Sequence, residues 1–239
     1  MARTSIWASI ATTLSGEIAA GHYGPGDKLP TEAALAQRFG VNRHTVRHAL
    51  ADLAASGAVH ARRGAGVFVA QQATDYPLGR RVRFQQNVLA SGRTPSREIL
   101  RLETRPCNVQ EAEALGVQTG SAVHVVEGLS FADAAVLAMF SSVFPAARFP
   151  DFLMQMRQAE SVSAALAANG VADYTRQATK ITAIAADALL ALHLRLPQGA
   201  PVLRTIAVNI DAQGSPVEFG TTWFAGDRVT MTLAADDLS

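Results

Sequence analysis

The sequence predicts an α+β protein built in two parts, and three observations support this. In the first third of the chain, apolar residues recur at helical spacing, and glycine and proline interrupt them at intervals. From residue 82 to the end, the pattern changes to mixed helix and strand with more turns. The 239 residues are 49% hydrophobic and 17% charged, a composition that suits a well-packed core rather than disorder.

The first two helices are predicted for residues 4–20 and for the stretch after Pro30. In the first, Ile6, Ile10, Leu14 and Ile18 recur every four residues. GHYGPGDKLP (21–30) ends this helix, because glycine and proline do not continue it. The second helix has Thr31 as its N-cap and ends at Gly40.

A third helix is predicted within VNRHTVRHAL (41–50), beginning after Asn42 as N-cap. Its first turn carries Arg43, His44 and Thr45, and Arg47 lies four residues after Arg43 on the same face. A different face is apolar and suited to a core, with residues at i, i+4 and i+7: Val46, Leu50 and Leu53. The polar end of this helix is therefore free to contact a partner.

A hairpin follows in AVHARRGAGVFVA (58–70), with its tip at RRGAG. Helix, helix, turn, helix and hairpin form the layout of a winged helix-turn-helix, whose recognition helix enters the DNA major groove by its N-terminal residues. The chain has a net charge of only +1, but five arginines and a single acid lie between residues 38 and 63. Because such a basic patch attracts polyanions, we expect this part to bind double-stranded DNA.

We assign residues 1–71 to this first domain, 72–81 to a polar linker and 82–239 to a second domain. The second domain contains an internal repeat, because ALGVQTGSAVHVV (114–126) matches HLRLPQGAPVLRT (193–205) at an offset of 79 residues, from 120 to 199 for the shared glycine. Each copy follows an alanine-rich helix and leads into a strand and a turn, which indicates a pseudo-symmetric sheet.

Several classes of protein are not expected. Cys107 is the only cysteine, so an intrachain disulfide framework is excluded. His44, His48 and His60 have no acidic or cysteine partner at ligand spacing, so we expect neither a metal nor another cofactor. The first residues lack a signal peptide and no apolar run is long enough for a membrane span, which predicts a cytoplasmic protein with no membrane partner.

Two parts of the chain resemble one family. Residues 24–70, above all LPTEAALAQRFGVNRHTVRHAL, resemble the DNA-binding domain of the GntR family of bacterial transcription regulators. LGVQTGSAV, LPQGAPVLR and GSPVEFGTTWFAGDRV resemble the UTRA effector domain of its HutC-type branch. That resemblance implies an antiparallel sheet with helices, similar in fold to chorismate lyase. DYPLGRRVRFQQNVLASGRTP (75–95) is most similar to regulators of phosphonate-utilisation operons.

The resemblance implies which residues contact DNA. An arginine at the start of the recognition helix can donate two hydrogen bonds to a guanine, and a helix N-terminus suits phosphate oxygens. Arg38, near the second helix, is expected on the DNA backbone. The remaining implied contacts lie on the recognition helix and the wing: Arg43, His44, Thr45, Arg47, Arg63 and Gly64.

The implied effector site departs from the family. The strand matching VVEGLSFADAAV (125–136) carries one or two anion-binding arginines in many relatives, and Gly128 and Ser130 stand there in this chain. An anion would then need a cation elsewhere, from Arg83, Arg93, Arg97 or Arg176. The expected effector contacts are Arg83, Phe84, Gln86, Asn87, Thr94, Ser96, Ser130, Arg176 and Glu218.

These features predict a homodimeric repressor that a small anionic effector, related to a phosphonate, releases from a near-palindromic operator. The segment around Tyr76, Pro77 and Leu78 is the expected switch between the domains. Two alternatives remain: a DNA-binding regulator with no or altered effector response, and a small-molecule lyase built on the second domain. The sequence shows no nucleophile motif for an enzyme.

Overall fold

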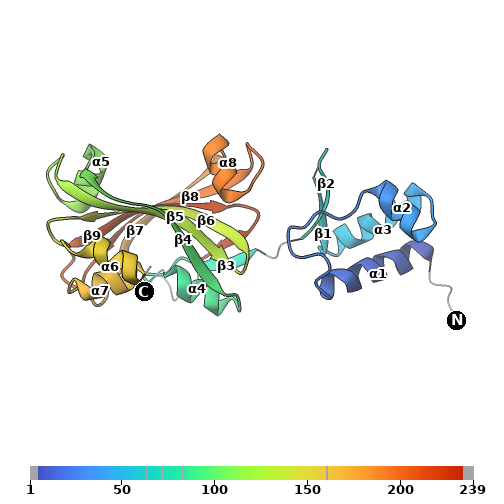
Figure 1. The fold of residues 1–239 in the computed structure, drawn as a ribbon, viewed down its shortest axis with the longest axis horizontal. Helices are drawn as coiled ribbons and strands as arrows, with labels where there is room; N and C mark the ends of the chain where they lie inside the picture. The colour runs from blue at the N-terminus through green and yellow to red at the C-terminus, as the bar shows by residue number, and fades with distance from the viewer. Residues whose placement is uncertain (1–4, 63, 71–72, 82, 160, 234–239) are drawn as a thin grey trace. The chain divides into compact units, whose positions relative to one another are not determined.

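The computed structural model describes residues 5–62, 64–70, 73–81, 83–159 and 161–233. The chain divides into two compact units, Met1–Gln72 and Ala73–Ser239, and Figure 1 shows the elements of each. The first unit is helical with one hairpin, and the second is built on a single large sheet. This is the predicted α+β fold with its two parts.

The N-terminal unit has the predicted order of helices and strands. Its core contains Leu14, Leu35 and Val46, which are fully buried. The five elements are α1 (Ile6–Ala19), α2 (Glu32–Phe39), α3 (Arg43–Ala55), β1 (Val59–Arg62) and β2 (Gly66–Val69). The strands β1 and β2 pair as an antiparallel hairpin, so the winged helix-turn-helix layout is confirmed.

Local signals fix the turn between α2 and α3. The side chain of Thr31 accepts a hydrogen bond from the amide of Ala34 at 3.2 Å and caps α2. Gly40 ends α2 in the left-handed conformation with φ 63°, which a glycine adopts without strain. Two residues later Asn42 caps α3, so the end of one helix and the start of the next are both fixed by local residue choices.

The C-terminal unit is organised around a six-stranded antiparallel sheet with the order β4-β5-β6-β9-β8-β7. Its strands are β4 (Pro95–Pro106), β5 (Ala122–Ala132), β6 (Ala135–Pro145), β7 (Thr175–Ala185), β8 (Pro201–Ile210) and β9 (Pro216–Ala225). In Figure 1, α5 (Val109–Leu115) and α8 (Ala188–Leu194) cover one face. The other face carries α4 (Phe84–Ala90), α6 (Phe152–Ala159) and α7 (Val162–Ala168).

The internal repeat is real in three dimensions. The helices α5 and α8 begin at Val109 and Ala188, an offset of 79 residues from 109 to 188, and occupy equivalent places on the sheet. Their N-caps are Asn108 and Asp187, again 79 apart, and both accept a hydrogen bond from the amide three residues later. Each repeat contributes three strands, and β6 pairs with β9 where the two halves meet.

The predicted linker 72–81 is partly wrong. Residues 74–77 form β3 (Thr74–Pro77), which pairs in parallel with β10 (Val229–Thr232) in the second unit. Thr74 and Tyr76 are buried while Asp75 between them is exposed, so the alternation of a strand is present but spans only four residues. Because its partner strand lies more than 150 residues away in sequence, from 77 to 229, local reasoning missed it.

None of the helices among the described residues is both long enough and apolar enough to cross a membrane.

Candidate functional site

The first candidate site is the N-terminal turn of α3. The Asn42 side chain accepts hydrogen bonds from the Thr45 amide at 2.8 Å and from the Thr45 hydroxyl at 3.0 Å. Arg43 and His44 are exposed, and neither side chain makes a hydrogen bond within the described part of the chain. The first amides of a helix have no acceptor inside it, so the start of α3 presents donors outward.

Two of the predicted DNA-contacting arginines are held by acids. Arg47 donates to both carboxylate oxygens of Glu32 on α2, at 3.1 and 2.8 Å. Arg38 makes a two-point ion pair with Glu17 on α1, with Nη1 3.0 Å from Oε2. The Arg47 hydrogen bond lowers the pKa of the Glu32 carboxyl below its ordinary value. Both arginines can therefore reach DNA only by giving up or sharing these partners.

The backbone of the wing is described except at residue 63. Gly64 has φ 75°, in the left-handed region, which lets the chain turn tightly between β1 and β2. Arg63, predicted to contact DNA, lies outside the described residues. Elsewhere in this unit His48 stacks on Trp7 of α1 with a ring separation of 4.3 Å, so it serves packing between α1 and α3.

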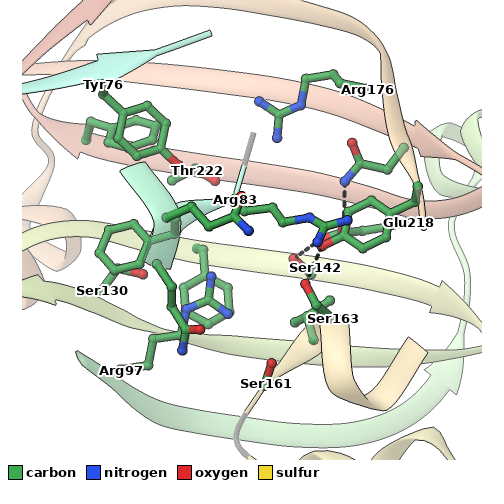
Figure 2. Close-up of a pocket in the computed structure, with 18 residues that line it drawn as sticks. Tyr76, Arg83, Arg97, Ser130, Ser142, Ser161, Ser163, Arg176, Glu218 and Thr222 are labelled. Carbon is green, nitrogen blue, oxygen red and sulfur yellow. Dashed lines mark hydrogen bonds between the residues drawn. The ribbon is translucent and has the colours of Figure 1, made fainter. Parts of the chain in front are cut away.

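The second candidate site is a pocket in the C-terminal unit, with a cavity volume of about 190 Å³. Figure 2 shows three arginines, one glutamate and several hydroxyl groups around it. The lining comes from β3, the α4 and α7 segments and the strands β4 to β9: Tyr76, Arg83, Phe84, Gln85, Gln86, Arg97, Ser130, Phe140, Ser142, Ser161, Val162, Ser163, Tyr174, Arg176, Asn209, Glu218, Thr222 and Phe224.

Arg97 is a buried cation of this pocket whose neighbours are aromatic rings rather than acids. Its guanidinium stacks over the rings of Phe84, at 5.5 Å, and Phe140, at 5.0 Å. Its Nε is buried without an acceptor, and no ion pair involves Arg97 among the described residues. Burial lowers the pKa of Arg97 below its ordinary value, while Tyr76 and Glu218 nearby favour the charged form.

Arg83 and Arg176 complete the set of cations. Arg83 donates to Asp173 at 2.6 Å and lies over the Tyr174 ring at 5.2 Å. Arg176 lies on β7 opposite Asn209 of β8, and its side chain points toward the pocket in Figure 2. The Nε atoms of both arginines are buried with no acceptor within the described residues. Buried donors without partners are costly, so this pocket suits a ligand that supplies acceptor oxygens.

Glu218 is the acidic residue of the lining and is only 8% exposed. Ser142 donates to one of its oxygens at 2.6 Å and Asn209 to the other at 2.7 Å. These bonds run across neighbouring strands, since Asn209 on β8 pairs with Glu218 on β9. The pocket thus combines an excess of positive charge with one well-anchored carboxylate.

Most of the predicted effector residues line the pocket, and the others do not. Six line the pocket: Arg83, Phe84, Gln86, Ser130, Arg176 and Glu218. Asn87 is buried beside it and donates to the carbonyl of Pro77 at 3.2 Å. Thr94 and Ser96 do not line it, and the Thr94 amide donates to Asp133. Arg93, also considered as an anion-binding cation, is instead paired with Asp133 at 2.8 Å.

Positions 128 and 130 carry no arginine, and the structure places a cation near them from another strand. Arg97 on β4 is the register partner of Ser130 on β5, so a cation does reach this place from the neighbouring strand. At Gly128, a Cβ atom would lie 2.4 Å from the Glu98 carbonyl oxygen. No side chain fits at position 128, and the positive charge is carried by β4 instead.

Sequence reasoning missed several polar residues of the pocket. Ser142 and Asn209, like the predicted Glu218, are buried polar residues in strands that are otherwise largely apolar, and this is the signal by which they could be found. Ser163 and Tyr174 share a hydrogen bond of 2.9 Å between α7 and the chain entering β7. Within the described residues no cluster of His, Cys, Asp or Glu could hold a metal ion.

Comparisons with known proteins cover both units. Residues 7–69 match the family described as bacterial regulatory proteins, gntR family, and residues 90–230 match the UTRA domain. An uncharacterised HTH-type transcriptional regulator of Rhizobium meliloti is 39% identical over 230 residues, 96% of this chain and 94% of that protein. A protein of Escherichia coli named "Probable transcriptional regulator PhnF" is 33% identical over 213 residues, 89% and 88% of the two chains.

A solved structure agrees with these relatives. The crystal structure of PhnF from Mycobacterium smegmatis has a TM-score of 0.64 and 26% sequence identity to this chain, covering 96% of this chain and 98% of that one. The same order of domains therefore extends over almost the whole length of both proteins.

Proposed function

Because the chain belongs to the GntR family of bacterial regulatory proteins and carries a UTRA domain, we propose that it is a repressor whose C-terminal pocket binds a small anionic effector. It is a DNA-binding transcriptional regulator, as its relatives are named regulators or repressors. The effector, its phosphonate-like character, the release from DNA and the homodimer are the proposed parts. The lyase alternative has no support among these relatives.

One observation carries the proposal: the uncompensated positive charge of the pocket. Arg97 has aromatic rings as its neighbours and a buried Nε with no acceptor among the described residues. Arg176 has the same unmet donor, and Arg83 has its own besides the ion pair with Asp173. A phosphonate, phosphate or carboxylate would supply the oxygens that these guanidinium groups lack.

On the DNA side, we assign base contacts to Arg43 and His44, because they are exposed at the N-terminus of α3 and their side chains make no hydrogen bond in the described chain. Arg47 and the wing residues Arg63 and Gly64 are assigned to the phosphate backbone, with Arg38. Thr45 donates both its amide and its hydroxyl to Asn42, so it holds the capping side chain in place, and its hydroxyl oxygen is left to accept a hydrogen bond from a base amino group. A two-fold dimer would read two such half-sites.

The proposed link between the sites is β3. Tyr76 lines the pocket and packs on Phe224 at 4.9 Å between ring centroids, and its strand directly follows the N-terminal unit in sequence. Burial raises the pKa of the Tyr76 hydroxyl, and Arg176 and Arg97 act on it electrostatically. A ligand held by these arginines therefore acts on the strand that leads to the DNA-binding unit. Crosslinking the units should abolish ligand-induced release; release that persists would contradict this route.

The test uses the full-length chain. Thermal unfolding is measured with inorganic phosphate, methylphosphonate and acetate, since a ligand that binds only the folded state raises Tm. DNA fragments of the source genome selected by the protein provide the operator for release measurements. We expect at least one anion to raise Tm and to weaken operator binding, and Arg97→Ala to remove both effects.

Arg157→Ala is the matched control, because Arg157 is an exposed arginine on α6 that does not line the pocket. If no anion changes Tm while the operator is still bound, the protein is the alternative regulator without an effector response. If no specific fragment is selected at moderate salt, operator binding without a ligand is ruled out.

A further inference from the structure

We propose that the ligand of the pocket is a small zwitterion, in which a cationic ammonium group sits against Glu218 and the anionic group against Arg97. This inference rests on the proposed function, because it takes the pocket as the effector site. The excess of arginine in the pocket accounts for the anionic group of the ligand. The present inference adds its cationic group.

The first step is the separation of charges within one pocket. Figure 2 shows Arg97 and Ser130 on one side, Glu218 and Ser142 on another, and Arg176 pointing between them. No ion pair joins Glu218 to an arginine in the part of the chain that the structure describes, and Arg83 is paired with Asp173 instead. The pocket therefore has a positive and a negative side that do not neutralise each other by direct contact.

The second step concerns the acceptors that Glu218 still offers. Each carboxylate oxygen has two lone pairs, and Ser142 and Asn209 use one on each oxygen. Those two donors are neutral, so they orient the carboxylate without neutralising its charge, on which Arg97 acts electrostatically from farther away. Because Glu218 is only 8% exposed, water does little to screen that charge. A ligand ammonium would supply both donors and the opposite charge, whereas a ligand hydroxyl would supply a donor alone.

The third step is size. A cavity of about 190 Å³ is smaller than the roughly 300–1,000 Å³ typical for drug-sized ligands. The ammonium and the anion must therefore be joined by a short chain of carbons.

The experiment compares two ligands of the same shape. In 2-aminoethylphosphonate an ammonium ends the chain, and in n-propylphosphonate a methyl group takes its place. Binding of each to the full-length protein is measured by calorimetry and by the shift in Tm. We expect the amine to bind at least tenfold more tightly, and Glu218→Gln to remove that preference while leaving the affinity for n-propylphosphonate equal or higher.

Glu127→Gln is the control variant. Glu127 is a partly buried glutamate on strand β5 of the same sheet that pairs with Arg101 and does not line the pocket, so its loss should leave the preference intact. If the wild-type protein binds both ligands equally, the zwitterion is wrong while an anionic effector stands. If neither ligand binds but phosphate or acetate does so through Arg97, the same conclusion follows. If no anion binds, both the inference and the proposed effector site are overturned.

Discussion

The ring of Phe140 occupies the space in which a side chain at Gly128 would lie. The two residues are register partners on β5 and β6, and a Cβ atom on Gly128 would be 3.0 Å from two atoms of that ring. On the other side it would meet the carbonyl oxygen of Glu98 at 2.4 Å. The same ring carries the guanidinium of Arg97, so the missing side chain at 128 and the cation from β4 belong to one arrangement.

The first prediction is that arginine at position 128 will not restore an anion site. Gly128→Arg forces Phe140 and the Glu98 backbone apart, and overpacking of this kind costs about 1–3 kcal/mol or more. We expect a lower free energy of unfolding by urea and weaker binding of any anion. Gly16→Ala is a useful comparison, because a Cβ there meets nothing within 4 Å and a helical alanine should be neutral or stabilising. Tighter anion binding by Gly128→Arg would contradict this explanation.

The second prediction separates two arginines on the DNA side. Arg43→Ala should cost about 1–3 kcal/mol on the operator and much less on random DNA, if the side chain reads a base. Arg38→Ala should weaken both DNAs similarly and flatten the salt dependence, because a phosphate contact carries no sequence information. Titrations of operator and random duplex over a range of salt concentrations measure both effects. Equal losses on both DNAs for both variants would refute the division of roles.

The ion pair between Arg38 and Glu17 calls for its own control. If Arg38 mainly fastens α2 to α1, Glu17→Gln should lower thermal stability as much as Arg38→Ala does and leave DNA affinity unchanged. If Arg38 contacts phosphate, releasing it with Glu17→Gln should increase affinity for all sequences. Measuring Tm and DNA affinity on the same samples distinguishes the two outcomes.

The third prediction concerns Arg228, which is 9% exposed and lies just before β10. Its guanidinium donates to the carbonyls of Val136, Leu194 and Arg195, at 2.7, 2.8 and 3.0 Å, and so joins the end of α8 to β6. Arg228→Met leaves those acceptors without this donor, at about 1–3 kcal/mol for each group that stays unsatisfied. We expect a large loss of stability in urea unfolding, whereas Arg157→Met, at an exposed position of α6, should have almost no effect. A loss below 1 kcal/mol for Arg228→Met would show that water replaces it.

The fourth prediction is a pH dependence from Glu111. Arg105 donates to both its oxygens at 2.7 and 2.6 Å, and this hydrogen bonding, with the amide of Asn108, lowers the pKa of the Glu111 carboxyl below its ordinary value of 4.5. A carboxyl with a lower pKa in the folded chain stabilises above its unfolded pKa and loses that contribution as the pH falls through the folded one. Glu111→Gln should therefore destabilise at pH 7 and much less at pH 3. A constant difference in unfolding free energy at both pH values would refute this origin.

The sequence alone determined the N-terminal unit, because its signals are local. The caps Thr31 and Asn42 act on amides three residues ahead, and Gly40 acts within its own turn, so each can be recognised in a short window. The repeat of the second unit was also visible, since both copies have a glycine at the equivalent place before the next strand, Gly120 and Gly199. What such windows cannot contain is a partner from a distant strand.

The pocket was decided by the tertiary structure. Arg93 and Arg97 are four residues apart and equivalent by sequence, yet Arg93 is bound to Asp133 while Arg97 faces Ser130 in the pocket. The difference arises because the register of β4 on β5 places Arg97 opposite Ser130, whereas Arg93 precedes β4 and meets Asp133 in the turn after β5. Both contacts join residues about 30–40 positions apart in the sequence. Arg97 and Glu218, which lie in the same pocket, come from strands of different repeats, β4 and β9. Periodicity gives the face on which a side chain lies, but only the assembled sheet determines which charges it meets.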